Sequence, residues 1–164
     1  MIASRAVELN DWILALHLLA AFAIVAAEVI FGAMIVALWK TDSTARVDSF
    51  FRISQVGTWL VQAGLGGTVL FGVWLAISKD PYDLWDGWII AGLVLWAAAA
   101  GLGAGAGKAY GEAGMEARKL ATAGTQTSAA VAETFGPSKA FRLHIVSNVL
   151  VVLILIDMIW KPGA

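Results

Sequence analysis

The sequence predicts an all-α integral membrane protein, a four-helix antiparallel bundle that forms one domain over residues 1–164. Three observations support this class. Of the 164 residues, 60% are hydrophobic and only 14% are charged, which is outside the usual range of soluble globular domains. Four apolar runs are each long enough to cross a bilayer as a helix, which takes about 20 residues. Polar segments rich in turn-forming residues separate the runs.

The first predicted span covers residues 12–39. It contains no Pro, and its main polar interruptions are His17 and Glu28. These two lie eleven positions apart, about three turns plus 20°, so they project from one face of the helix. An ionisable group in mid-membrane costs about 2.5–3.5 kcal/mol on insertion scales, so this face is expected to turn toward protein or a wet cavity. Asn10 or Asp11 is expected to cap the helix.

The second and third spans are predicted over residues 53–77 and 88–107. Gln62 is the main polar interruption of the second. The second half of the third, residues 97–107, contains almost only Ala and Gly. Two interpretations of this half stay open. Small residues at spacings of four let helices pack closely in a membrane, and they would also leave room for a flat cofactor or a water-filled pocket.

The fourth span is predicted over residues 139–160, with Ser138 as its N-cap. Residues 108–138 form the longest connection, a cytoplasmic loop. Within this loop, residues 112–120 and 129–135 have helical character, and Gly136 followed by Pro is expected to end the second of these helices.

The distribution of basic residues predicts the topology. Eight of the eleven Lys and Arg residues lie in or beside the first and third connections. The positive-inside rule therefore places these connections in the cytoplasm and both termini outside it. Five of the eight Trp residues fall at the outer helix ends, as in an aromatic belt. We expect a multi-pass protein of the cell membrane, surrounded by the lipid bilayer. The acidic residues before the first run disfavour a cleaved signal peptide there.

Several polar side chains share one depth in this topology. At 1.5 Å per residue, Glu28 and His144 each lie about 24 Å from the outer ends of their helices, and Gln62 lies about 23 Å from its own. Ser147 and Asn148 follow His144 at i+3 and i+4, so they share its face. These residues form a predicted polar cluster in the inner half of the membrane.

Glu28 and His144 are candidate cofactor-binding residues. A buried carboxylate and imidazole perturb each other's proton affinity, which suits a proton-handling or metal-binding pair. The alternative is an interhelical hydrogen bond worth about 0.6 kcal/mol that fixes helix register. His17 lies about 16 Å above the level of His144, so one iron cannot bind both, although a haem with one ligand is compatible with either. Asp157 is near His17 in depth, but we expect it to face interfacial water.

Several kinds of chemistry find no support. The chain has no cysteine, which excludes disulfides, thiolate metal sites and iron–sulfur clusters. The Gly-rich run lacks the Walker spacing, because Leu102 and Ala109 stand where Gly and Ser or Thr are needed. A net charge of −1 gives no case for nucleic acid. No catalytic residue is assigned, the metal is unknown, and whether the protein is an enzyme stays undecided.

Two segments resemble known membrane families. They are residues 12–21, Trp-Ile-Leu-Ala-Leu-His-Leu-Leu-Ala-Ala, and the ending from Phe141-Arg142 to Lys161-Pro162. They are similar to four-helix proteins around the CopD-like copper-resistance proteins and the HemJ-type protoporphyrinogen oxidases, and to an uncharacterised family of predicted integral membrane proteins of this size. The resemblance implies that His17 matches a first-helix haem-ligand candidate, and haem b is the cofactor that it suggests.

Two functions follow from the sequence. The first is a haem- or metal-associated redox or transport module that uses His17 or the polar cluster. The second is a non-catalytic accessory subunit, in which polar residues set helix register and the outer surface binds a membrane protein partner or a second copy of the chain.

Overall fold

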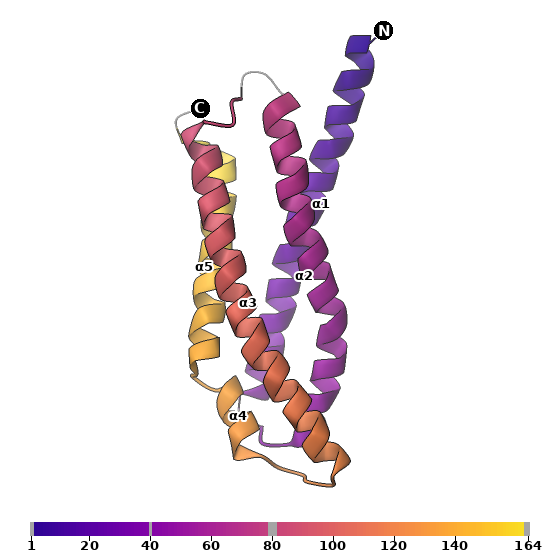
Figure 1. Cartoon of the computed structure of the whole chain (residues 1–164), viewed down its shortest axis with the longest axis vertical. Helices are drawn as coiled ribbons and strands as arrows, with labels where there is room; N and C mark the ends of the chain where they lie inside the picture. The colour runs from indigo at the N-terminus through magenta and orange to yellow at the C-terminus, as the bar shows by residue number, and fades with distance from the viewer. Residues whose placement is uncertain (1, 40, 79–81, 163–164) are drawn as a thin grey trace.

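The computed structural model describes residues 2–39, 41–78 and 82–162, with side chains from Leu9 onward. It confirms the all-α bundle. The helices are α1 (Ile2–Leu38), α2 (Thr44–Ser78), α3 (Gly87–Thr122), the short α4 (Ala129–Phe135) and α5 (Lys139–Trp160). Helices α1, α2, α3 and the α4–α5 stretch supply four segments long and apolar enough to cross a membrane. The chain is therefore a multi-pass membrane protein. The start of α1 and the end of α5 lie at one end of the bundle, the termini end, and α4 lies at the other, the α4 end (Figure 1).

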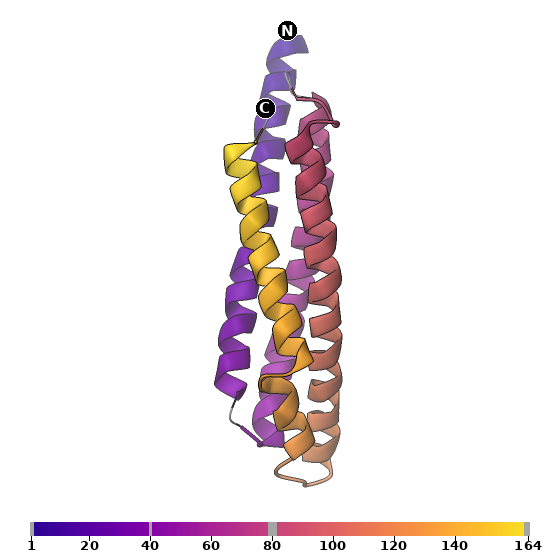
Figure 2. The same cartoon turned by 90° about the vertical axis from the view of Figure 1, so that its left-hand side faces the viewer.

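The bundle consists of two helical hairpins, α1 with α2 and α3 with α5, which meet mainly where α2 packs against α3 (Figure 2). Glycine allows the first hairpin to close. At Gly64 of α2, an added Cβ would lie 2.9 Å from the carbonyl oxygen of Ala20 on α1. Only a residue without a side chain permits that approach, which is how small residues bring membrane helices together.

The second hairpin closes along the small-residue face of α3. The hydroxyl of Ser147 on α5 donates to the carbonyl oxygen of Ala99 at 3.0 Å. An added Cβ at Gly103 would lie 3.1 Å from the same Ser147 oxygen. Gly101 and Gly107 have nothing within 4 Å of an added Cβ. The Gly-rich half of α3 therefore packs against α5 on one face only and is open elsewhere.

Each end of the bundle has a small core. At the termini end, Trp88 and Ile89 pack with Ala76, and Lys161 donates to the hydroxyl of Tyr82 at 2.6 Å. The core at the α4 end joins α1, α2, α3 and α4, and its buried residues are Leu38, Val47, Ala113, Ala117, Val131 and Phe135. This second core lies beyond the predicted third span, at the level where α3 continues out of the apolar region.

Three local predictions are wrong. Neither Asn10 nor Asp11 caps α1, because the helix begins at Ile2. Residues 108–122 are not part of a loop, because α3 continues to Thr122, which confirms the helix predicted over residues 112–120. The second helix begins before its predicted span, because residues 44–52 also belong to α2. The extensions of α2 and α3 pack in the core at the α4 end, and this tertiary packing stabilises them.

Two other local predictions are confirmed. The Ser138 hydroxyl accepts from the backbone N–H of Phe141 at 3.2 Å and so caps α5. Helix α4 spans Ala129–Phe135, as predicted, and ends directly before Gly136.

Candidate functional site

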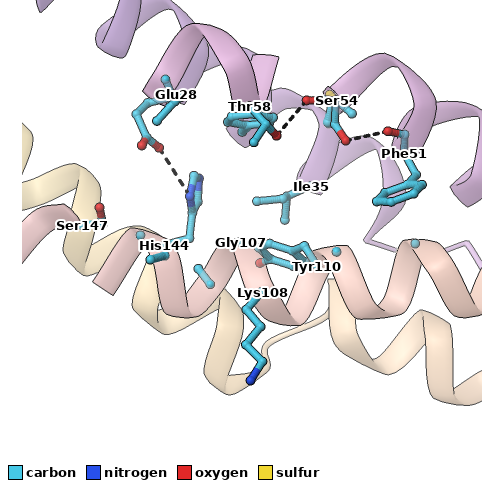
Figure 3. Close-up of a pocket in the computed structure, with 18 of the residues that line it drawn as sticks. Glu28, Ile35, Phe51, Ser54, Thr58, Gly107, Lys108, Tyr110, His144 and Ser147 are labelled. Carbon is cyan, nitrogen blue, oxygen red and sulfur yellow. Dashed lines mark hydrogen bonds and ion pairs between the residues drawn. The ribbon is translucent and has the colours of Figure 1, made fainter. Parts of the chain in front are cut away.

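Glu28 of α1 and His144 of α5 face each other across the bundle (Figure 3). Glu28 Oε2 lies 3.5 Å from His144 Nδ1. Asn148 lies one turn further along α5, and its side-chain nitrogen is 3.1 Å from His144 Nε2. An amide N–H₂ can only donate, so Nε2 accepts and the proton of a neutral imidazole is on Nδ1, the ring nitrogen nearer to the carboxylate. The three side chains thus form one chain of polar contacts.

This contact joins the two hairpins at a place where the backbone allows it. Gly32 lies one turn after Glu28 on α1, and an added Cβ there would be 3.8 Å from His144 Nε2. The side chains are largely shielded, with 15% of Glu28 and 9% of His144 exposed. Depth alone predicted that the two residues share a level, and the structure shows that their helix faces also meet.

A cavity of about 630 Å³ lies beside this pair, between the two hairpins. We call it the central cavity. Residues of α1, α2, α3 and α5 line it, together with Phe135 of α4. Its end toward the termini is formed by Ile24, Leu65 and Val151 near the Glu28–His144 pair. From there it extends along the bundle to the α4 end. Its volume is in the range typical of small-molecule sites, about 300–1,000 Å³.

The α3 wall of the central cavity consists mostly of Gly and Ala, with Lys108, Tyr110 and Met115 as its larger residues. Gly107 and Gly111 line it, and an added Cβ at either would meet nothing within 4 Å. Ala99 and Gly103 line it as well while they pack against α5. Both interpretations of the Gly-rich segment therefore apply, each to part of the helix. The face toward α5 packs closely, and the neighbouring face leaves open space.

The α2 wall includes a row of polar side chains among apolar ones. Ser54, Thr58 and Gln62 line the cavity at i, i+4 and i+8, so they share one face of the helix. The Thr58 hydroxyl donates to the Ser54 carbonyl oxygen at 3.0 Å, and the Ser54 hydroxyl donates to the Phe51 carbonyl oxygen at 2.8 Å. Each hydroxyl proton is therefore engaged within the helix, which leaves the oxygens as acceptors. Gln62 lines the cavity as predicted for the level of Glu28, but it is exposed at the cavity edge.

His17 belongs to a different environment. Its Nδ1 lies 2.9 Å from the Thr68 carbonyl oxygen, which can only accept, so Nδ1 carries the proton. The ring packs against Gly72, where an added Cβ would lie 3.0 Å from His17 Cε1. His17 does not line the central cavity. Asp157 is buried rather than facing interfacial water as predicted, and it contacts the α3 backbone at Gly92.

The donor set does not fit a resident haem in this arrangement. Both ring nitrogens of His144 contact protein side chains, so neither is free to bind iron without displacing Asn148 or Glu28. His17 has a free Nε2 lone pair but lies outside the central cavity. Within the described part of the chain, no group of three or more His, Cys, Asp or Glu side chains is placed to hold a metal ion.

Sequence reasoning missed the lining residues at the α4 end, among them Phe51, Tyr110 and Met115. Tyr110 stacks on Phe135 with ring centroids 5.3 Å apart. Its hydroxyl is buried and has no hydrogen-bond partner among the described residues. These residues were assigned to connections, since the predicted spans began at 53 and ended at 107. The one sequence feature that could have indicated them is that Tyr110 and Met115, two large side chains, follow directly after the Gly-rich segment.

Together, the fold and the site define a four-helix integral membrane protein with an intramembrane cavity between two hairpins. Comparison of the chain with protein-family models, with curated proteins and with solved structures gives no match.

Proposed function

We propose that the chain is a membrane transport or binding module that admits an amphipathic small molecule into the central cavity from the α4 end. The observation that carries this proposal is the shape and position of the cavity. It is open along much of the inner part of the bundle and ends at the Glu28–His144 pair. This is the transport branch of the redox or transport function that the sequence predicts.

The Glu28–His144 pair serves in this proposal as the closing contact on the outward side. It links α1 to α5, and few other contacts join these two helices. Transporters of many folds place their sites near the bilayer midplane and alternate access by moving one helical unit against another. The two hairpins meet mainly where α2 packs against α3, so a single polar contact between α1 and α5 on the other side of the cavity is suited to such a motion.

The orientation in the membrane is part of the proposal. The excess of Lys and Arg at the α4 end supports a cytoplasmic location for that end and an outside location for both termini. The central cavity then opens toward the cytoplasmic half of the cell membrane. Kinship with the CopD-like and HemJ-type families remains a prediction of the sequence.

Cysteine accessibility tests the proposal, because the chain contains no cysteine of its own. Gly107→Cys places a thiol at the cavity wall, and Gly101→Cys places one on the same helix at an open position that does not line the cavity. A charged, membrane-impermeant methanethiosulfonate is added to one face of sealed vesicles at a time. We expect Gly107→Cys to react from the α4 side only and Gly101→Cys, which faces lipid, to react from neither.

The closing contact is tested in the same assay. Addition of His144→Ala to the Gly107→Cys variant is expected to allow modification from the termini side as well. A Gly107→Cys thiol that is unreactive from the α4 side, or equally reactive from both sides without His144→Ala, would overturn the proposal.

A further inference from the structure

The central cavity is long. On α3 its lining runs from Ala99 to Met115, and the sixteen residue steps between them correspond to about 24 Å of helix. The cavity volume is about 630 Å³. This shape suits a single extended hydrocarbon chain, which lies along the Gly and Ala wall.

The cavity ends at the α4 end beside a basic groove on the surface. The groove is lined by Phe51, Met115, Arg118, Lys119, Thr122 and Ala123. Phe51 and Met115 line both spaces, so the cavity and the groove adjoin. A site with two cationic side chains therefore lies next to the α4 end of the cavity.

The charge of the basic groove is available to a ligand. Lys119 lies 3.7 Å from Glu116, with both side chains exposed, so this pair is weak. Arg118 has no carboxylate within 4 Å among the described residues. It lies thirty residues after Trp88, about 45 Å along α3. A bilayer with its headgroups is about 40–45 Å thick, so Arg118 lies at headgroup level when Trp88 lies at the opposite surface.

From this juxtaposition we propose that the central cavity and the basic groove together bind a single-chain anionic lipid from the leaflet at the α4 end. Its hydrocarbon chain lies along the Gly and Ala wall, and its negative headgroup binds Arg118 and Lys119. The inference rests on the proposed function and names the ligand class for the same cavity. Phosphate headgroups suit this groove because Arg donates several N–H bonds in a fixed planar fork.

Two lysolipids with the same chain test the headgroup. The full-length protein in phosphatidylcholine nanodiscs is titrated with 1-oleoyl lysophosphatidate or 1-oleoyl lysophosphatidylcholine, and binding is followed by native mass spectrometry. We expect the anionic lipid to bind at least about tenfold more tightly than the zwitterionic one. Inorganic phosphate is the third probe, and it is expected to compete poorly because it lacks the chain.

Matched variants assign the two parts of the site. Arg118→Gln with Lys119→Gln is expected to remove the preference for lysophosphatidate. Lys139→Gln with Arg142→Gln removes the same charge at the same end of the bundle, outside both spaces, and is expected to retain the preference.

The chain-binding part is tested at two open glycines of α3. Gly111→Leu fills the cavity and is expected to abolish binding of both lipids. Gly101→Leu lies outside the cavity and is expected to leave binding unchanged.

The outcomes separate the two proposals. Equal affinity for the two lysolipids, a preference that survives Arg118→Gln with Lys119→Gln, or phosphate that competes as well as lysophosphatidate would overturn the anionic-lipid inference. If both lysolipids bind and Gly111→Leu blocks them, those results leave the cavity proposal standing. Binding of neither lipid would overturn the anionic-lipid inference, and the reactivity of Gly107→Cys then decides the cavity proposal separately.

Discussion

The carboxylate of Glu28 lies 3.5 Å from Nδ1 of His144 and joins one helical hairpin to the other. We predict that a double-mutant cycle of Glu28→Gln and His144→Gln gives a coupling energy of about 0.6–1.7 kcal/mol, the range measured for polar pairs between membrane helices. Glutamine keeps the size and hydrogen-bonding capacity of the side chain while it removes the acid–base pair. The free energy of unfolding in mixed micelles, titrated with denaturing detergent, provides the measurement.

A distant pair is the control for this cycle. Glu28→Gln combined with Tyr82→Phe, at the termini end, should be additive within about 0.3–0.5 kcal/mol. If the Glu28–His144 cycle is equally additive, the contact does not hold the hairpins together.

Two glycines on α2, Gly64 and Gly66, provide a matched pair of substitutions that tests the packing of the first hairpin. An added Cβ at Gly64 would lie 2.8 Å from Ile24 Cγ1 and 2.9 Å from the Ala20 carbonyl oxygen. Gly64→Ala is therefore expected to destabilise the protein by about 1–3 kcal/mol, as overpacking does. At Gly66 nothing lies within 4 Å of an added Cβ, so Gly66→Ala should be neutral or stabilise by up to about 1 kcal/mol through helix propensity. The same unfolding titration measures both, and equal effects at the two positions would contradict the close approach of α1 and α2.

The four spans were predictable because the bilayer imposes a strong rule. A segment that crosses it must be apolar over about 20 residues, and that property can be read from each segment alone. The shared level of Glu28 and His144 followed from the same rule, because rise per residue converts sequence position to depth. Their contact needed one more fact, the rotation of each helix about its axis, which depends on partners that are distant in sequence.

Where helices continue beyond their most apolar segment, hydropathy does not predict how far they extend. Residues 108–122 continue α3 because they pack against α4 and the start of α2, and that core depends on tertiary contacts. The central cavity was equally hard to predict. Gly103 packs against Ser147 whereas Gly107, one turn later, faces open space. Identical residues at a helical repeat take different roles because only some of them face a side chain of α5, and no local pattern records which ones do.

A spectroscopic prediction follows from the ring contacts of His144. Because Glu28 and Asn148 contact its two nitrogens, protein purified in mild detergent should show no stoichiometric Soret band. Supplementation with haem should not produce a saturable one. Visible absorption spectra of oxidised and dithionite-reduced wild type, His144→Ala and His17→Ala provide the measurement. A wild-type haem band that disappears in only one variant would identify the ligand and restore the haem interpretation.

The last prediction concerns the connection between α3 and α4, which hydrogen bonds from Thr44 hold against α2. Thr44 begins α2, is 1% exposed, and its hydroxyl donates to the Thr125 carbonyl oxygen at 2.6 Å. Its backbone N–H donates to the Gln126 carbonyl oxygen at 3.0 Å. Thr44→Val keeps the shape and removes the hydroxyl, so the Thr125 carbonyl loses a donor in a shielded position, at a cost of about 1–3 kcal/mol.

Hydrogen exchange followed by mass spectrometry shows which part of the chain loses stability in Thr44→Val. Because the lost bond ties the connection to α2, peptides that cover residues 123–128 should exchange faster in Thr44→Val, while peptides from the middle of α1 and α5 keep their protection. Thr122→Val is the control. Its hydroxyl donates to the Arg118 carbonyl oxygen one turn back within α3, at an exposed position, so its loss should leave the connection unchanged. Equal exchange of residues 123–128 in both variants would show that the Thr44 hydroxyl does not hold the connection in place.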